Sequence, residues 1–219
     1  MARTTLPTAP IAGLSPGVQS QGVWTGRRQL FVRFAGEAET AVLYSSEMLA
    51  KQLDRATTQA LVHSILLSGR DPLSCAPFIA AVFGNWASPL PVILESDGQR
   101  PDALEDVVRV VSMVQVLWEF PDAPSGAERT VASLAAVAAA GTAHALTLAP
   151  RDGTSDGQIL RLVEQAHAAA PGTKIVIHPA PAGEKSPLDR RYATLLEQAT
   201  MIHRDVVLAM RIPGPVGTR

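Results

Sequence analysis

Short apolar segments that alternate with longer, helix-like segments are the feature that most limits how this chain can fold. The apolar segments carry few polar residues, which is typical of strands buried on both faces. The segments between them have helical spacing or are rich in alanine. We expect strands at residues 29–34, 60–67, 91–94, 114–120, 143–149, 174–178 and 206–212, and helices at 45–57, 76–83, 102–111, 125–140, 155–170 and 188–203. This alternation predicts an α/β fold with a mainly parallel sheet, which either closes partly into a barrel or lies open.

The first 27 residues differ in composition from the rest of the chain. They are rich in Pro, Thr, Ser and Gly, which indicates an extended tail without a core of its own. Apolar side chains between the prolines could anchor such a tail on another protein, and the candidates are Leu6, Ile11, Leu14 and Trp24. We therefore expect a tail at residues 1–27, a single α/β domain at 28–212 and a C-terminal tail at 213–219.

Composition excludes several classes of protein. No apolar run reaches the roughly 18 residues that a membrane span needs. The formal net charge of -1 and the lack of a basic block argue against nucleic acid as the main partner. The 1 cysteine excludes an internal disulfide and a cysteine-rich metal site. Because the N-terminus lacks the apolar core of a secretory signal, we expect a cytoplasmic location.

Charged side chains follow the ends of several expected strands. In parallel α/β folds the carboxyl ends of the strands meet at one edge, where ligands bind. These side chains form either a site for a charged small molecule or cation, or a solvated rim of ion pairs. The candidate ligand-binding residues are Arg33, Arg70, Asp71, Glu95, Asp97, Glu119 and His178. The other histidines, His63, His144, His167 and His203, have no metal-ligand spacing with one another, so no metal site is predicted.

Three motifs give the chain a family resemblance. QSQGVWTGRRQLFVRFAG at residues 19–36 resembles the opening of radical S-adenosylmethionine enzymes of the 7-carboxy-7-deazaguanine synthase type, which read roughly QGEGxxxGRPxxFxRxAGCNLxCxxCDT. SGRDP at residues 68–72 resembles the family's TGGEP, and ESDGQ at 95–99 resembles its ETNGT. The resemblance implies a partial (β/α)6 radical-SAM-like barrel.

The same resemblance implies that the radical chemistry is absent. The family's three cluster cysteines fall on Glu37, Ala41 and Tyr44, none of which carries a thiolate. Iron–sulfur clusters need soft thiolate ligands, so we expect no cluster and no other cofactor. Arg70 also places a long cation within the motif that, in the family, contacts S-adenosylmethionine.

Three functions are compatible with these observations. The first is a non-catalytic pseudoenzyme that serves as a structural or accessory subunit of a larger protein assembly. The second is a protein that binds a small molecule, purine-like or a nucleotide, at the carboxyl ends of the strands. The third is a repurposed enzyme that runs non-radical acid–base or metal chemistry with Asp71, Glu95, Glu119 and His178.

Overall fold

The computed structural model describes residues 7–119, 124–151, 153–179 and 190–212. Within these residues the strands form one sheet in the order β3-β1-β2-β4-β5-β6-β7-β8-β9. The strands are β1 (Thr8–Val18), β2 (Arg28–Phe34), β3 (Val42–Ser45), β4 (Ser64–Gly69), β5 (Val92–Ser96), β6 (Met113–Glu119), β7 (Ala143–Ala149), β8 (Lys174–Ile177) and β9 (Val206–Leu208). Neighbouring strands from β2 through β4 to β9 are parallel. The predicted α/β class with a mainly parallel sheet is therefore confirmed.

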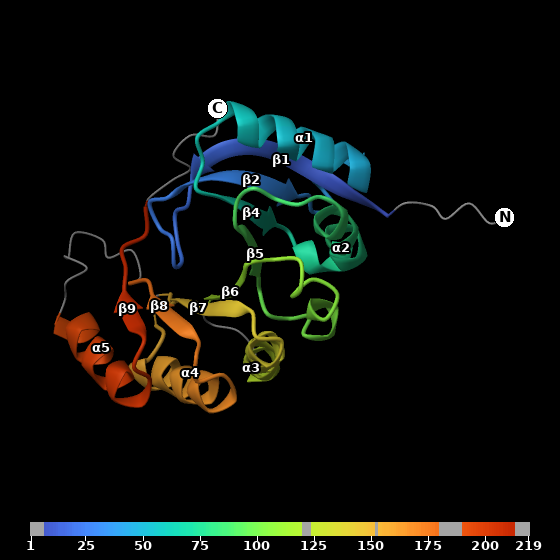
Figure 1. Cartoon of the computed structure of the whole chain (residues 1–219). Helices are drawn as coiled ribbons and strands as arrows, with labels where there is room; N and C mark the ends of the chain where they lie inside the picture. The colour runs from blue at the N-terminus through green and yellow to red at the C-terminus, as the bar shows by residue number, and fades with distance from the viewer. Residues whose placement is uncertain (1–6, 120–123, 152, 180–189, 213–219) are drawn as a thin grey trace.

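The helices lie on one side of a strongly curved sheet. They are α1 (Ser46–Gln59), α2 (Ala76–Asn85), α3 (Pro124–Ala139), α4 (Asp156–Ala169) and α5 (Arg190–Ile202), with short 3₁₀ turns η1 (Pro72–Cys75) and η2 (Asp102–Leu104). Figure 1 shows the sheet bent into a C, with the helices outside it and the loop between β1 and β2 inside it. We call the inner side of the sheet its concave face.

Side-chain alternation along the strands separates an apolar face from a polar one. Leu30 and Val32 of β2, like Val114 and Val116 of β6, are buried in the core between sheet and helices. Residues one position away point to the other face. Several of them are buried and polar, namely Gln29, Ser64, Ser68, Gln115, Thr147 and His178. The concave face therefore carries the polar groups that a binding site could use.

The helix boundaries follow local signals in the sequence. Ser45 caps α1, since its side chain accepts a hydrogen bond from the backbone of Met48. Ser155 and Gln158 form a capping box at the start of α4. The predicted helix at 102–111 is wrong, because only Asp102–Leu104 forms a 3₁₀ turn and the rest forms turns.

The expected N-terminal tail is also wrong over most of its described length. Residues Thr8–Val18 form β1, which pairs antiparallel with both β2 and β3. Backbone hydrogen bonds to two neighbours hold this segment in the sheet despite its prolines, and Pro16 lies where only β2 is paired with it. The predicted C-terminal tail at 213–219 lies outside the described residues.

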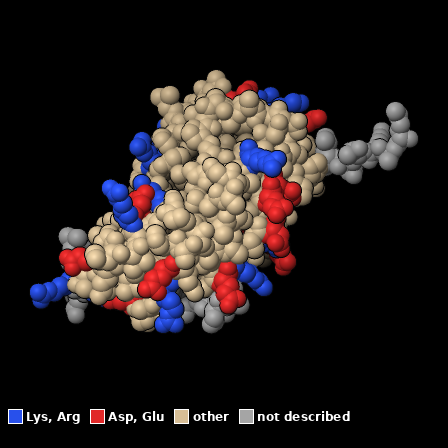
Figure 2. Space-filling model, turned by 60° about the horizontal axis from the view of Figure 1, so that its bottom comes forward, with Lys and Arg blue, Asp and Glu red and all other residues tan. Residues whose placement is uncertain are grey.

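Charged side chains of both signs are mixed on one face of the molecule (Figure 2). On the face in Figure 2, Lys and Arg side chains lie among Asp and Glu side chains and do not gather into one basic tract. This face lacks the continuous positive surface that phosphate-backbone binding uses. No helix among the described residues is long and apolar enough to span a membrane.

Candidate functional site

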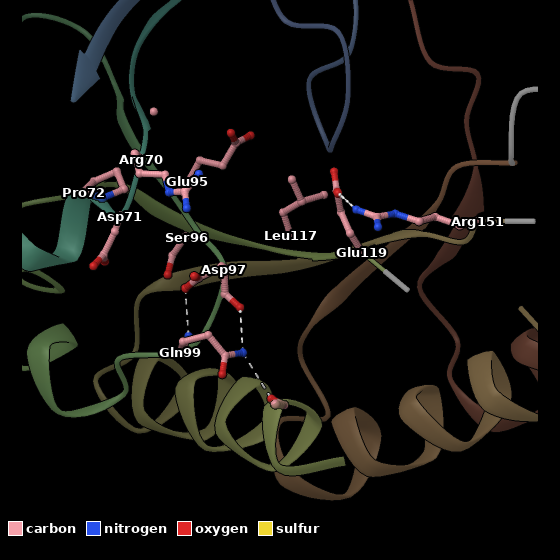
Figure 3. Close-up of a pocket in the computed structure, with 12 residues that line it drawn as sticks. Arg70, Asp71, Pro72, Glu95, Ser96, Asp97, Gln99, Leu117, Glu119 and Arg151 are labelled. Carbon is pink, nitrogen blue, oxygen red and sulfur yellow. Dashed lines mark hydrogen bonds and ion pairs between the residues drawn. The ribbon is translucent and has the colours of Figure 1, made fainter. Parts of the chain in front are cut away.

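A pocket of about 800 Å³ opens at the carboxyl ends of β4, β5 and β6. We call this pocket the mouth, and Figure 3 shows its charged side chains around one cavity. Its lining comprises Gly69, Arg70, Asp71, Pro72, Glu95, Ser96, Asp97, Gln99, Leu117, Glu119, Gly126 and Arg151. The structure thus brings together five of the seven predicted ligand-binding residues, namely Arg70, Asp71, Glu95, Asp97 and Glu119.

Two carboxylates of the mouth are already paired with arginines. Both oxygens of Asp71 accept hydrogen bonds from Nε of Arg100, at 2.9 and 2.7 Å. Glu119 accepts a hydrogen bond from Arg151 at 2.6 Å and lies 3.7 Å from the guanidinium of Arg211. These pairs are half-exposed, so they neutralise charge and contribute little to stability. The prediction of a rim of ion pairs therefore fits this part of the mouth.

Arg70 and Asp97 are exposed at the same opening without an ion pair among the described residues. The backbone N–H of Arg70 donates to the Phe34 carbonyl, which fixes where its side chain begins. Asp97 accepts a hydrogen bond from the Gln99 backbone at 2.9 Å, in a turn that follows β5. Both charged groups remain able to contact a ligand.

Glu95 is partly buried, whereas Asp97, the other carboxylate of the mouth without an ion pair among the described residues, is exposed. Its Oε2 accepts a hydrogen bond from Nε2 of Gln115 at 3.2 Å. Burial raises the pKa of Glu95, and the bond from Gln115 and the charge of Arg211 oppose that rise. A carboxyl group with a perturbed pKa in a pocket is a feature of binding and catalytic sites.

The loop between β1 and β2, residues 19–27, reaches into the concave face behind Glu95. The backbone N–H of Val23 donates to Oε1 of Gln115 at 3.0 Å, so Gln115 joins the loop to Glu95. Gln21 also accepts a hydrogen bond from Arg211, which lies beside Glu119. The sequence prediction missed Gln115 and Arg211, because a mid-strand glutamine and an arginine near the end of the described chain carry no motif.

His178 is not part of the mouth, although it was predicted to be. It is fully buried beyond the end of β8, where Nδ1 donates to the Ala209 carbonyl at 2.7 Å. Its Nε2 accepts a hydrogen bond from the backbone of Gly22 at 2.7 Å. Burial lowers the pKa of His178, consistent with a neutral ring whose two nitrogens both have partners. The four residues of the acid–base hypothesis are therefore not brought together, because His178 lies outside the mouth that Asp71, Glu95 and Glu119 line.

Arg33 is also outside the lining of the mouth. Its exposed side chain lies 3.9 Å from Glu39, in the loop that follows β2. An ion pair this exposed contributes little to the stability of the fold.

The three positions on which the resemblance places the cluster cysteines carry side chains that do not fit an iron–sulfur cluster. Glu37 and Ala41 are exposed between β2 and β3, and Tyr44 lies within β3 against the core. Their side chains offer a carboxylate, a methyl group and a phenol, which do not fit a cluster that needs thiolates. Among the described residues there is no group of three or more His, Cys, Asp and Glu side chains that could hold a metal.

The predicted partner anchors pack within the chain itself. Ile11 is 3% exposed in the core, and Leu14 is partly buried against it. Trp24 lies edge-on to His63 with ring centroids 4.6 Å apart. These side chains are therefore not the free anchors of a docking tail, and Leu6 lies outside the described residues.

Comparisons with known proteins find one similarity in sequence and one in fold. The chain is 28% identical over 122 residues to the 7-carboxy-7-deazaguanine synthase of Methanothermobacter thermautotrophicus, a match that covers 49% of this chain and 48% of the synthase. The fold is similar to the crystal structure of QueE from Escherichia coli, with a TM-score of 0.56 at 14% identity over 93% of this chain and 94% of that one. No protein-family model matches the chain.

The two similarities support a relationship to QueE-like proteins at the level of fold and weak homology. The chain matches about half of the synthase's length, and the structural match alone establishes only the fold. Activity and substrate are separate questions, because they depend on the residues of the site.

Proposed function

We propose that this chain is a radical-SAM-like pseudoenzyme with a partial (β/α)6 barrel, and that its mouth binds a small molecule without radical chemistry. The observation that carries the proposal is the pocket itself, where Oε1 of the partly buried Glu95 carboxyl accepts no hydrogen bond from the described residues. Burying such a group costs free energy unless a partner is supplied. A ligand is the partner that the pocket leaves room for.

The absence of thiolates supports the non-catalytic part of the proposal. Glu37, Ala41 and Tyr44 stand where the resemblance places the cluster ligands. Without a cluster there is no route for an electron to a bound sulfonium, so radical generation has no starting point. Loss of the cluster ligands does not prevent the rest of the fold from binding a small molecule.

The charges of the mouth indicate the ligand's chemistry. Oε1 of Glu95 accepts no hydrogen bond from the described residues and suits an N–H donor, such as the edge of a purine-like base. Arg70 lies at the same opening and suits an anionic substituent such as a phosphate. A purine nucleotide satisfies both requirements.

Calorimetric titration with purine bases, nucleosides and nucleotides tests ligand binding. We expect saturable binding that Glu95→Gln weakens roughly tenfold or more, since a hydrogen bond to a charged group is worth about 1.5–3 kcal/mol. The matched control is Glu164→Gln on the exposed face of α4, which should bind like the unaltered protein. Failure of all these ligands to bind, or equal affinities for the two variants, would count against the proposal.

Iron–sulfur reconstitution tests the non-catalytic part separately. Incubated anaerobically with iron and sulfide, the protein should remain colourless, while an authentic 7-carboxy-7-deazaguanine synthase treated in parallel should turn brown. Stoichiometric iron bound by this chain alone would require ligands other than those considered above.

A second candidate function is that of a structural or accessory subunit, and the sheet edge favours it. β3 is an edge strand on which Val42 and Leu43 are 57% and 63% exposed, and Met48 in the first turn of α1, which follows β3 directly, is 47% exposed. Exposed apolar side chains on an edge strand are typical of a protein contact. We expect Leu43→Lys to release proteins that copurify from the native cell, whereas Leu61→Lys, at a side chain 92% exposed, should not. Identical copurification from both variants would argue against this surface.

A further inference from the structure

Two histidines far apart in the sequence meet outside the mouth. His167 lies in the last turn of α4, and His203 follows the end of α5. Their Nδ1 atoms are 3.1 Å apart, and their ring planes are inclined at 75°. The separation of 36 residues explains why no ligand spacing was visible in the sequence.

The hydrogen bonds of His203 define which nitrogen carries a proton. Its Nε2 lies 2.6 Å from the Thr173 carbonyl, which can only accept, so Nε2 is the donor. In the neutral ring Nδ1 is then an acceptor, and the Nδ1–H of His167 donates to it. The lone pair of His203 is thus aimed at His167 from a fixed ring.

The ring of His203 is held in the interior, whereas the ring of His167 is free to turn. His203 is 1% exposed, whereas His167 is exposed on the surface of α4. A cavity of about 430 Å³ opens beside His203 and is lined by Pro171, Gly172, Arg204 and Asp205. Solvent and ions can therefore reach the pair.

We propose that His167 and His203 bind a divalent transition metal through their Nδ1 atoms. With metal–nitrogen bonds of about 2.0–2.1 Å, nitrogens 3.1 Å apart subtend an angle of about 100° at the metal. That angle lies between those of octahedral and tetrahedral coordination. The bond from His203 to the Thr173 carbonyl is the kind of outer contact that orients a metal-bound imidazole.

Metal binding requires a change of tautomer and a turn of the exposed His167 ring, because a metal about 2.0–2.1 Å from both nitrogens lies to one side of the line that joins them. The proton on Nδ1 of His167 is lost to solvent, and its Nε2 takes one up, so the ring stays neutral and binding releases no net proton. The two imidazoles are the ligands that the described residues supply, and water completes the coordination. Imidazole ligands suit Zn²⁺ and Cu²⁺, and Cu²⁺ should bind more tightly than Zn²⁺.

Copper titration of the tag-free full-length chain, followed by electron paramagnetic resonance and visible absorption, tests the site. We expect one equivalent of Cu²⁺ with nitrogen hyperfine structure, and a Zn²⁺-dependent rise in melting temperature. His167→Ala should lower the affinity roughly tenfold or more and abolish the rise. Because this side chain is exposed, the variant should remain folded.

The matched control is His144→Gln, which removes a histidine whose Nδ1 lies 2.9 Å from the Thr142 carbonyl at the start of β7. It should bind one equivalent of Cu²⁺ like the unaltered protein. No saturable binding by the unaltered chain, or equal affinity in His167→Ala, would overturn the proposal and leave the pair as a hydrogen bond alone.

Discussion

Replacement of Gly22 by alanine tests whether the β1–β2 loop supports the mouth from behind. Gly22 has a φ of 97°, and a Cβ added there would lie 2.1 Å from Oε1 of Gln115. Gln115 is 1% exposed and bonded to both Val23 and Glu95, so it cannot move without breaking those bonds. The alanine must therefore displace either the loop or the glutamine.

Three contributions set the expected loss of stability in Gly22→Ala. A left-handed backbone costs a residue with a Cβ about 1–2 kcal/mol. Overpacking in a filled interior adds about 1–3 kcal/mol, and each hydrogen bond lost adds about 1 kcal/mol. Gly26→Ala is the matched control, because its φ is 85° but the nearest atom to an added Cβ is 3.9 Å away.

Urea denaturation followed by circular dichroism measures both variants. We expect Gly22→Ala to be less stable than Gly26→Ala by about 2–4 kcal/mol, or by roughly 4–16 °C in melting temperature for a chain of this size. Equal losses in the two variants would refute the packing of the loop tip against Gln115.

Three further perturbations address Glu95, α4 and β1. Because burial raises the pKa of Glu95, its contribution to stability is present below the ordinary value of 4.5 and is lost as pH rises through the raised pKa. Glu95→Gln should therefore be more stable than the unaltered protein at neutral pH but not in acid, and parallel pH-dependent melting curves would contradict this. Ser155→Ala removes the capping box of α4 and should cost about 1 kcal/mol in urea denaturation, whereas an unchanged midpoint would mean that the cap is redundant. Ile11→Ala should cost about 2–5 kcal/mol by the same assay, and a loss near zero would restore the docking-tail interpretation of residues 1–27.

The parallel part of the fold was predictable because its signals are local. The capping residues of α4 and the continuous apolar runs of β6 and β7 each specify their element from adjacent positions. Strand β1 was missed because its prolines and glycines are typical of loops, and only pairing with β2 and β3 makes the segment a strand.

The helix predicted at 102–111 was wrong for a different reason. Leu104, Val107, Val108 and Val111 have helical spacing and are all buried, so the pattern was correct about burial. Its β-branched valines weaken the helical backbone, and the chain forms turns that bury the same side chains.

The parts of the site that depend on contacts between residues far apart in the sequence could not be predicted. Strand ends correctly located Asp71, Glu95 and Glu119 at the mouth, because parallel strands end at one edge. Nothing local to His178 indicates that the loop at Gly22 packs against it, since that contact joins residues 156 positions apart.

The contact between Gly22 and His178 also bears on the order of folding. Bringing residues 156 positions apart together lowers the entropy of the chain before the contact between them can stabilise it. We therefore expect the contact between Gly22 and His178 to form late in folding. During synthesis, Gly22 can contact His178 only after the segment that follows β8 has left the ribosome. The hydrogen bond from the backbone of Ile212 to the Ser20 carbonyl can form only later still. Until then the polar concave face of the sheet is open to solvent, and the support behind Glu95 is among the last parts of the protein to form.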